Sequence, residues 1–593
     1  MRNHSITVQV CMGTGGIASG GADVLAAFRQ EIEAAGLSAD IRENCSAHQV
    51  GCRGLCAKDV LVDVLINGEK VTYQFIKADM VERIVREHII EKTPVREWTV
   101  GEDYHAFHKK QVKVVLSDCG RLDPESIDDY IAANGYEAAR TIVSSWTPEQ
   151  VINEVKASGL RGRGGAGFPT GMKWELARMS ISDTKYIICN ADEGDPGAFM
   201  DRAVIEGNPH SVIEGMIIGA LAICSRKGYV YIRAEYPLAV ERLRLAIREA
   251  RQRGFLGKNI FGTMLDFDIV VKLGAGAFVC GEETALIASI EGQRGMPRAK
   301  PPFPVNKGLW QKPTVINNVE TLANIPYIMR KGAKWFSSYG TEKSKGTKVF
   351  ALTGKIMNTG LIEVPMGITL REIIYDIGGG IEGGKNLKAV QTGGPSGGCI
   401  PAGMLDLNVD YESLAKVGSI VGSGGMIVLN EDDCMVNMAK YFIQFTQEES
   451  CGKCVPCRVG TKRLLEIMER ITVGKGKESD LELLETLSTS IKVTSLCGLG
   501  QTAPNPVLST LKYFREEFEA HIRDKKCPAK VCKELIIYSI LEDACKGCGA
   551  CLRACPAGAI TGEKKKPHRI DPEICIRCGA CFDVCKFKSV GRD

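Results

Sequence analysis

Residues 159–174 read GLRGRGGAGFPTGMKW, and this stretch decides which fold the largest part of the chain can adopt. Gly162 to Gly167 satisfy G-x-G-x-x-G, the dinucleotide-binding spacing, which needs a strand just before it and a helix just after it. The preceding residues, Thr147 to Val155, predict instead a helix with an N-cap and a proline at its first position. We therefore reject an ordinary Rossmann unit. The N–H groups of the glycine run can still cradle a phosphate.

Further polar and glycine-rich stretches surround this loop in the sequence. Lys173 supplies a cation beside the glycine run, and Phe168 supplies an aromatic face for a flat ring. Four more stretches follow along the chain: Asn190–Gly197 after a predicted strand, Gly274–Thr284, Lys300–Pro304 and Val315–Thr321. A solvated acidic turn is the competing interpretation of Asn190–Gly197 taken alone.

Together, the five stretches resemble the NADH-binding flavoprotein subunit of respiratory complex I and its soluble relatives, from about residue 146 to about residue 510. The resemblance implies a non-Rossmann domain that holds FMN and stacks NAD(H) on it. Hydride then passes between the two cofactors, so no catalytic side chain is expected. The FMN contacts implied by position are Gly162, Gly164, Lys173, Asn190, Asp192, Gly281, Glu282, Glu283, Asn317, Asn318 and Thr321.

The same resemblance implies a set of nicotinamide-nucleotide contacts. These are Phe168, Asp195, Phe278, Glu283, Lys300 and Phe303. Two of them depart from the family, because Phe278 stands where Tyr is common and Asp195 where Glu is common. NAD(H) remains the expected nucleotide, and the departures leave NADP(H) open beside it.

Eight cysteines near the C-terminus predict two [4Fe–4S] clusters, because they form two C-x2-C-x2-C-x3-C runs. In this pattern the fourth cysteine of each run binds the other cluster. The predicted ligand sets are Cys545, Cys548, Cys551 and Cys585 for one cluster, and Cys575, Cys578, Cys581 and Cys555 for the other. A disulfide framework and a pair of zinc sites are the competing interpretations. Neither suits four thiols crowded into eleven positions, twice, in a chain with no visible export signal.

Two further groups of cysteines lie in a helical region. Cys451, Cys454 and Cys457, with the distant Cys497, predict a third [4Fe–4S] cluster, and the complex I subunit carries a cluster at this motif. A zinc site is the alternative there. A second group, comprising Cys434, His521, Cys527 and Cys532, contains candidate zinc ligands, with unliganded cysteines as the alternative. We interpret the isolated Cys119, Cys189, Cys224, Cys280 and Cys399 as small apolar residues.

The N-terminal region resembles a thioredoxin-like domain with an incomplete metal site. Thioredoxin-like subunits of this group hold a [2Fe–2S] cluster by C-x4-C and C-x3-C. Cys11, Cys52 and Cys56 are present, but Gly16 stands where the second ligand is expected. Cys45 is a candidate replacement. We expect no cluster here, or a labile one, and a structural or docking role.

The expected fold class is α/β and α+β multidomain. The expected domains are residues 1–95, thioredoxin-like; 96–145, a connector; 146–335, FMN- and NAD(H)-binding; 336–430, ubiquitin-like and strand-rich; 431–534, a helical bundle with one [4Fe–4S] cluster; and 535–593, ferredoxin-like. The 593-residue length suits several domains, and 24 cysteines without an export signal favour redox or metal work in the cytoplasm.

Charge and hydropathy exclude two classes of partner. A net charge of +4 is too small to indicate nucleic acid binding. The longest uncharged apolar run, residues 215–224, is far shorter than the ~20 residues that a membrane-spanning helix needs.

The whole composite resembles the β subunit of soluble NAD-linked complexes, which include electron-bifurcating [FeFe]-hydrogenases, NADP-reducing hydrogenases, and related formate dehydrogenases and transhydrogenases. This implies a diaphorase that exchanges electrons between NAD(P)H, FMN, iron–sulfur clusters and ferredoxin. The implied partners are a small thioredoxin-like [2Fe–2S] subunit and a larger catalytic subunit. The alternatives are a peripheral NADH dehydrogenase module of a membrane complex and an electron-relay subunit that binds no nucleotide.

Overall fold

The computed structural model describes residues 6–37 and 45–593. Within these residues the chain divides into two compact units. The first comprises Met1–Gly384, Val390–Gly397 and Ala402–Val428, and the second comprises Lys385–Ala389, Gly398–Pro401 and Leu429–Asp593. Each unit is described by itself. No helix of the described residues is long and apolar enough to cross a membrane.

A four-stranded, fully parallel sheet lies at the centre of the first unit. Its strands are β5 (Tyr186–Ala191), β6 (Lys227–Arg233), β7 (Asp268–Gly274) and β8 (Thr314–Asn318), in the order β7-β6-β5-β8. The chain therefore runs outward from β5 to β7 and then returns to the other side of β5. Such a reversal of strand order opens a crevice at the carboxyl ends of the central strands, where ligands of open α/β sheets bind.

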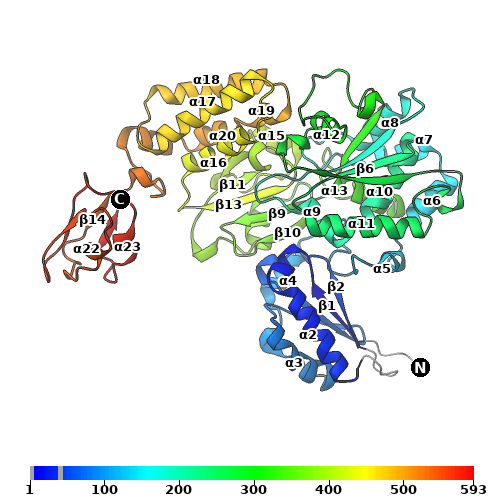
Figure 1. The fold of residues 1–593 in the computed structure, drawn as a ribbon, viewed down its shortest axis with the longest axis horizontal. Helices are drawn as coiled ribbons and strands as arrows, with labels where there is room; N and C mark the ends of the chain where they lie inside the picture. Colours follow the sequence, from blue (N-terminus) through cyan, green and yellow to red (C-terminus); the bar gives the residue numbers. More distant parts are fainter. Residues whose placement is uncertain (1–5, 38–44) are drawn as a thin grey trace. The chain divides into compact units, whose positions relative to one another are not determined.

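Helices surround this sheet and supply its core (Figure 1). They include α7 (Pro148–Ser158), α8 (Thr170–Met179), α9 (Met200–Gly207), α10 (Pro209–Ile223), α11 (Pro237–Gln252), α12 (Glu283–Ile290) and α13 (Val319–Lys331). Almost every residue of α10 is buried, as expected for a helix that is apolar all round. The predicted helix before the glycine loop is confirmed by α7, whose N-cap Thr147 forms a capping box with Gln150.

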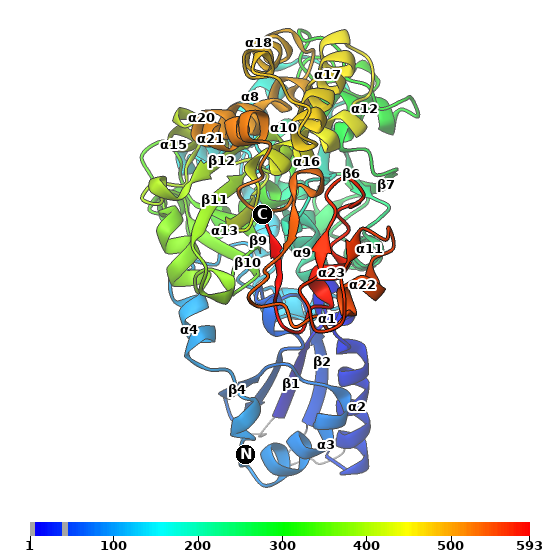
Figure 2. The ribbon, with the colours of Figure 1, turned by 90° about the vertical axis from the view of Figure 1, so that its left-hand side faces the viewer.

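The N-terminal part of the first unit is a mixed sheet in the order β2-β1-β3-β4. Its strands are β1 (Ile6–Cys11), β2 (Cys45–Val50), β3 (Val62–Ile66) and β4 (Glu69–Tyr73). β1 is parallel to β2 and antiparallel to β3. Asn67-Gly68, a typical two-residue hairpin sequence, joins β3 to β4 with positive φ at both residues. Helix α2 (Gly21–Ala34) packs along β1 and β2 (Figure 2).

The segment 96–145, which we predicted as a connector, carries three helices: α4 (Glu102–Lys109), α5 (Ile127–Ala132) and α6 (Glu137–Ser145). Apolar side chains of α5 and α6 belong to the same core as the parallel sheet. The strand-rich region contains β9 (Thr347–Gly354), β10 (Gly360–Pro365), β11 (Leu387–Thr392), β12 (Gly398–Pro401) and β13 (Gly425–Asn430), in the order β10-β9-β13-β11-β12.

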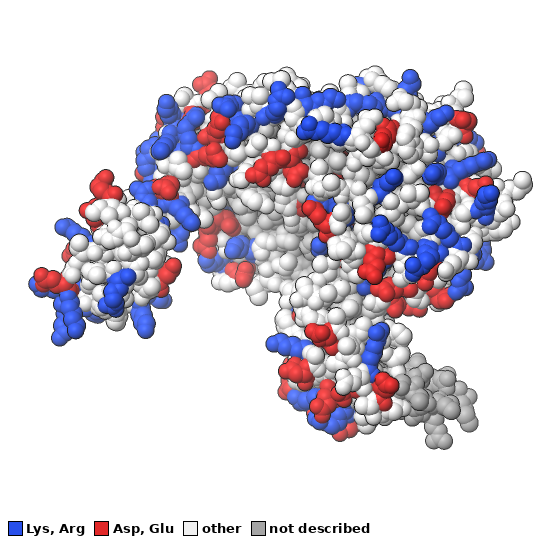
Figure 3. All heavy atoms as spheres, in the orientation of Figure 1, with Lys and Arg blue, Asp and Glu red and all other residues white. Residues whose placement is uncertain are grey.

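The second unit contains a helical bundle and a small cysteine-rich part. The bundle comprises α16 (Met435–Glu448), α17 (Val455–Thr472), α18 (Ser479–Thr494), α19 (Gly498–Thr502), α20 (Asn505–Tyr513) and α21 (Arg515–Glu519). The cysteine-rich part has two short helices, α22 (Ala550–Ala554) and α23 (Ala580–Asp583). It also has two strand pairs, β14 (Tyr538–Ile540) with β17 (Val590–Arg592) and β15 (Ile560–Thr561) with β16 (Arg569–Ile570). Acidic and basic side chains are interspersed on the visible faces of the chain (Figure 3).

Candidate functional site

The predicted flavin residues gather at the carboxyl edge of the parallel sheet. Asn190 lies near the end of β5, and Asn317 and Asn318 end the neighbouring strand β8. These are the two strands between which the order reverses, so their ends border the crevice that the topology predicts. The Nδ2 of Asn190 donates a hydrogen bond of 3.1 Å to the carbonyl of Gly281, which joins the segment after β7 to the same edge.

The glycine loop packs directly against the start of α13. The backbone N–H of Arg163 donates to the hydroxyl of Thr321 (2.8 Å), and a Cβ added at Gly164 would lie 3.0 Å from the Cβ of Asn318. A side chain at position 164 would force the loop away from the asparagine. At Gly162 an added Cβ would meet only the backbone of Phe168, at 3.6 Å. The loop is therefore packed tightly against the start of α13 at Gly164 but has free space beside Gly162. Free space next to backbone N–H groups is what a bound phosphate requires.

Lys173, in the first turns of α8, places its ammonium at the same edge. It donates a hydrogen bond of 3.1 Å to the carbonyl of Ile316, and it lies 6.0 Å from the ring centroid of Phe168. The next residue, Trp174, donates from its indole N–H to Oδ1 of Asn317 (2.9 Å). Burial lowers the pKa of Lys173, and the nearby Glu283 carboxylate opposes this shift.

Two adjacent acids and one lysine form an ionic group beside the loop. The Lys300 ammonium lies 2.9 Å from Oε1 of Glu282 and 2.6 Å from Oε1 of Glu283. The second oxygen of Glu282 caps α12 by accepting from the N–H groups of Thr284 (2.9 Å) and Ala285 (3.1 Å). Glu282 is thereby fixed by the helix start, whereas Glu283 and Lys300 remain partly exposed.

The aromatic residues expected to contact the nucleotide remain accessible. Phe168 is 42% exposed and Phe303 is 51% exposed, which is unusual for side chains of this size. Phe278 lies in the turn after β7, where a Cβ added at Gly194 would approach its ring to 3.0 Å.

Asp195 reaches this edge from the loop after β5. Its carboxylate accepts a short hydrogen bond from the hydroxyl of Ser423, and a Cβ added at Gly394 would come within 2.9 Å of its carboxyl carbon. Burial raises the pKa of Asp195 from 3.8 to about 6, and the Ser423 hydroxyl and the charge of Lys348 oppose the shift.

Sequence reasoning missed the residues that the strand-rich region contributes. Tyr411 donates a hydrogen bond of 2.9 Å to the carbonyl of Gly162, and its ring lies 4.2 Å from the guanidinium of Arg161. Ser423 holds Asp195 from the same region. Tyr411 and Gly162 are 249 positions apart, and no local pattern in the sequence marks either contact.

In the second unit, the four cysteines predicted for the bundle cluster come together. Cys451 and Cys454 lie in the loop before α17, Cys457 in its first turn, and Cys497 at the N-cap of α19. Burial raises the pKa of Cys457 to about 11, and the neighbouring thiols of Cys454, Cys497 and Cys451 add to the shift. Four thiols in mutual proximity fit a [4Fe–4S] cluster.

The cysteine-rich part places Cys555 with the second run of cysteines. A small cavity is lined by Cys555 together with Cys575, Cys578 and Cys581, the same set that the sequence predicts for one cluster. Cys545 and Cys548 are close enough to Cys551 to add to the burial-driven rise of its pKa. Cys585 and Cys551 belong to one small apolar core, which also contains Cys555 and Cys581.

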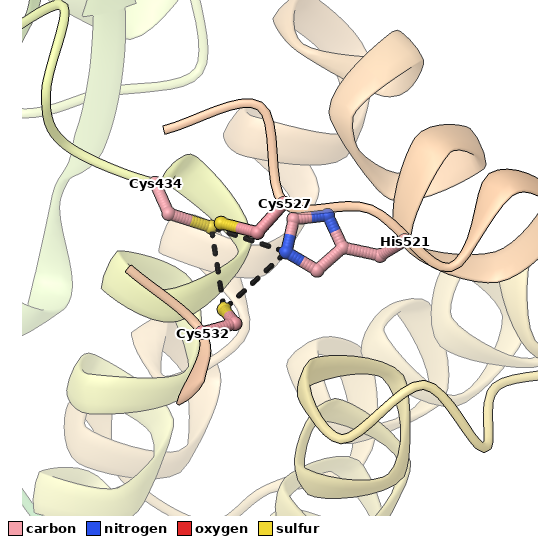
Figure 4. A group of neighbouring side chains, drawn as sticks. All are labelled: Cys434, His521, Cys527 and Cys532. Carbon is pink, nitrogen blue, oxygen red and sulfur yellow. Dashed lines mark hydrogen bonds between the residues drawn. The ribbon is translucent and has the colours of Figure 1, made fainter. Parts of the chain in front are cut away.

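Cys434, His521, Cys527 and Cys532 form a compact buried group (Figure 4). Their ligand atoms all lie within 4.8 Å of one another, and this is the one group of the described residues in which three or more donors come so close. Nε2 of His521 lies 3.4 Å from the Cys434 sulfur and 3.3 Å from that of Cys532. Nδ1 of His521 is 2.7 Å from the carbonyl of Glu517, the outer contact that orients a metal-binding histidine.

The N-terminal cysteines divide into two groups. Cys11, Cys52 and Cys56 lie at one edge of the N-terminal sheet, whereas Cys45 does not. Cys45 pairs with Ile6 at the far end of β1, five residues from Cys11, so it lies about 16 Å away along the strands. Cys45, a candidate replacement in the sequence, is therefore too far from the other three cysteines to complete their site. Among the cysteines interpreted as apolar, Cys119, Cys189, Cys280 and Cys399 are buried, but Cys224 is exposed.

Three family models match the chain. The Nuo51 FMN-binding domain matches residues 155–327, the NADH-ubiquinone oxidoreductase-F iron–sulfur binding region matches residues 437–521, and a 4Fe-4S dicluster domain matches residues 544–589. The chain is 62% identical over 482 residues to the NADP-reducing hydrogenase subunit HndC of Solidesulfovibrio fructosivorans, covering 81% of this chain and 98% of that protein.

The chain also resembles a second sequence relative and a solved structure. A subunit of the NADH-quinone oxidoreductase of Escherichia coli is 44% identical over 402 residues, which are 68% of this chain and 90% of that protein. Among solved structures, the crystal structure of an air-oxidized NAD+-reducing [NiFe]-hydrogenase has a TM-score of 0.61 at 30% identity, and the match covers 87% of this chain and 85% of that chain.

Proposed function

Because the chain belongs to the family of FMN-binding, iron–sulfur oxidoreductase subunits that includes the relatives above, we propose that it is the diaphorase subunit of a hydrogenase-type complex. In this family the subunit is a flavin-dependent NAD(P)H oxidoreductase within a larger assembly. For this chain we propose which residues bind FMN and the nucleotide, that three [4Fe–4S] clusters are present, and that electrons pass from the nucleotide through FMN to the clusters. The domain boundaries proposed are those expected from the sequence.

The convergence of the glycine loop, Lys173 and the Asn317–Asn318 pair at one sheet edge carries the proposal. When bound, FMN exchanges a hydride with NAD(P)H and passes electrons singly to iron–sulfur clusters. The glycine loop offers N–H groups to the FMN phosphate, and Lys173 offers those of its ammonium N–H groups that have no described partner. Asn190, Asn318 and Glu282 present polar groups to the remainder of the flavin.

The nicotinamide nucleotide would enter from the exposed side of this site. Phe168 and Phe303 present accessible rings, and Asp195 and Glu283 are the carboxylates placed to accept from ribose hydroxyls. Lys300, which pairs with both Glu282 and Glu283, sets the charge at this entrance. Phe278 adds an aromatic contact without a hydroxyl.

Three [4Fe–4S] clusters follow from the cysteine groups. One is held by Cys451, Cys454, Cys457 and Cys497, and two by the C-terminal runs with their fourth cysteines exchanged. Zinc occupies the Cys434–His521–Cys527–Cys532 group, where it joins the first turn of α16 to the segment after α21. Ferredoxin exchanges electrons at the C-terminal clusters, and a thioredoxin-like [2Fe–2S] subunit and a larger catalytic subunit complete the complex.

As-purified flavin content and NADH–viologen reductase activity test this function. The proposal predicts about one FMN per chain and activity with NADH or NADPH. A chain that binds clusters but neither FMN nor nucleotide would be an electron relay only, and this result would refute the diaphorase. Mass spectrometry of the co-purifying subunits separates a hydrogenase-type complex from a peripheral module of a membrane NADH dehydrogenase.

A further inference from the structure

The N-terminal sheet brings three cysteines and one acid to a single edge. β1 ends at Cys11, and the parallel β2 ends at Val50, two residues before Cys52. β3 runs antiparallel to β1 and starts beside its end, because the N–H of Cys11 donates to the carbonyl of Leu61 (3.0 Å). Asp59 stands two residues before Leu61. The topology therefore places it at the same edge as the thiols, a position that nothing in the cysteine spacing predicts.

The glycine-rich turn after β1 lies over this group. A Cβ added at Gly13 would lie 2.9 Å from the Cβ of Cys52, and one added at Gly16 would lie 2.2 Å from the carbonyl oxygen of Cys11. A cysteine at position 16 would thus collide with the backbone of Cys11 unless the turn moved. The turn therefore has no room for the Cβ of a cysteine at position 16.

Asp59 lies against the same turn at the neighbouring position, Gly15. A Cβ added at Gly15 would lie 3.2 Å from Oδ2 of Asp59 and 3.8 Å from the sulfur of Cys56, so both donors face the same point of the turn. Both carboxylate oxygens of Asp59 are inaccessible to solvent. Among the described residues, the Cys11 thiol and the backbone N–H of Leu61 are the donors beside them, and neither contact has the geometry of a full hydrogen bond. A buried carboxylate held this weakly is costly, by ~1–3 kcal/mol or more, unless a cation fills the site.

The two thiols on the opposite side are already arranged as a ligand pair. The sulfurs of Cys52 and Cys56 are 3.8 Å apart, which matches the separation of about 3.8 Å between two thiolates bound 2.3 Å from one tetrahedral metal ion. The N–H of Gly54 points to the Cys52 sulfur at 3.4 Å, a contact of the kind that tunes cluster thiolates. Cys11 and Asp59 form the second pair, because the Cys11 thiol lies beside the Asp59 carboxylate as a hydrogen-bond donor.

The distances favour two metal ions over one. A single tetrahedral ion would draw four donor atoms to within about 4 Å of one another. Among the described residues, only the Cys434 group has three or more donors within 4.8 Å, so no three of these four donors are that close. Two adjoining pairs of donors, joined by a contact between the thiols of Cys11 and Cys52, suit a two-iron cluster, in which each iron takes two protein ligands. The nearby guanidinium of Arg53 offsets part of the negative charge of three thiolates and a carboxylate.

We propose that Cys11, Cys52, Cys56 and Asp59 together hold a [2Fe–2S] cluster, with Asp59 as the ligand in place of the missing cysteine. This inference concerns a centre outside the flavin site and does not depend on the proposed diaphorase activity. It reverses the expectation from the sequence that this domain holds no stable cluster. It also gives the weakly held carboxylate of Asp59 a cation to bind.

The test uses the full chain purified without oxygen, with iron and sulfide analysis and electron paramagnetic resonance of the reduced protein. The spectrum is recorded at a temperature where the fast-relaxing [4Fe–4S] signals have broadened away. Relative to the wild type, Asp59→Ala should lose about two iron and two sulfide atoms per chain and the two-iron signal. Asp59→Cys should restore both with a shifted signal. The control Asp79→Asn changes an exposed acid of the same domain and should change neither.

Several results would overturn the proposal. The proposal fails if the wild type and Asp59→Ala have the same iron content and the same spectrum, whether both show the two-iron signal or neither does. It also fails if the wild-type site contains zinc instead of iron and Asp59→Ala removes that zinc. Flavin content and NADH–viologen activity should be unchanged in Asp59→Ala, so a failure of the diaphorase proposal would register separately. Recovery of the signal by Asp59→Cys distinguishes ligand loss from unfolding of the domain.

Discussion

The ammonium of Lys173 donates a hydrogen bond of 3.1 Å to the carbonyl of Ile316, one residue before the asparagine pair that ends β8. This contact ties the helix after the glycine loop to the strand on the far side of the sheet reversal. It also aims a cation at the crevice between β5 and β8. A lysine held by one carbonyl retains donors for a phosphate. Burial lowers the pKa of Lys173, and the Glu283 carboxylate opposes this shift.

Replacing Lys173 by methionine should therefore weaken flavin binding. The loss of one charge-assisted hydrogen bond, about 1.5–3 kcal/mol, raises the FMN dissociation constant roughly 10- to 100-fold. Fluorescence titration of the flavin-depleted protein measures this change. Lys185→Met is a matched control, because Lys185 also donates to two backbone carbonyls, at 2.9 and 2.7 Å, but precedes β5 at the opposite edge of the sheet. Equal FMN affinity in the two variants would contradict the role of Lys173.

Asp195 should make nucleotide binding depend on pH. Its folded-state pKa of about 6 lies above the ordinary 3.8 because of burial. Protonation of Asp195 therefore stabilises the folded state. This contribution to the free energy of unfolding is fully present below about pH 4 and is lost as the pH rises through about 6. The ionised form that accepts from ribose hydroxyls predominates only above about pH 6. The KM for NADH should rise as pH is lowered from about 7 to about 5.

In Asp195→Asn this pH dependence should disappear, with a raised KM already at neutral pH. The control Asp183→Asn removes an exposed acid that pairs with Lys312 before β5, and its pH profile should match that of the wild type. If the KM for NADH of Asp195→Asn depended on pH as it does in the wild type, another group would be responsible for the pH dependence.

The buried cysteine–histidine group should contain one metal ion. Elemental analysis should find about one zinc per chain in the wild type and almost none in Cys527→Ala or His521→Ala. Limited proteolysis should then cut the segment after α21 faster, because it loses its link to α16. Cys399→Ala removes a buried cysteine of the same unit outside the group and should retain zinc. Zinc retained in both ligand variants would refute the site.

If the fourth cysteine of each C-terminal run binds the other cluster, the iron losses of two cysteine variants should add only when the two residues serve different clusters. Cys555→Ala and Cys575→Ala should each lose up to about four iron atoms, and the double variant should lose no more, because both residues serve one cluster. Cys555→Ala with Cys545→Ala should lose up to about eight. The reverse pattern would show that each run binds its own cluster.

Local motifs were predictable because neighbouring residues carry them. The cysteine spacings, the capped helix before the glycine loop and the Asn67-Gly68 hairpin depend on short-range geometry, and the structure has each of them where the sequence predicts it. The strand β2 was missed because CSAHQV lacks the apolar alternation of a typical strand. It forms because β1 offers a parallel partner.

The contacts that complete the sites could not be predicted, because they join distant positions. Tyr411 reaches Gly162 from the strand-rich region, and Ser423 reaches Asp195 across 228 positions. Asp59 is an ordinary acid in the sequence and becomes notable only when the sheet places it beside three thiols. In the connector, α5 and α6 join the central core because burial of their apolar faces stabilises them.

Anaerobic titration of the as-isolated chain with NADH, followed by absorption of the flavin and of the iron–sulfur clusters, measures whether electrons pass from the nucleotide through the flavin to the clusters. We predict that NADH bleaches the flavin band and then the cluster absorption. In a Cys451→Ala variant flavin reduction should be retained and cluster reduction slowed. Clusters that dithionite reduces but NADH leaves oxidised, in a chain that contains FMN, would contradict a path from nucleotide through flavin to iron–sulfur.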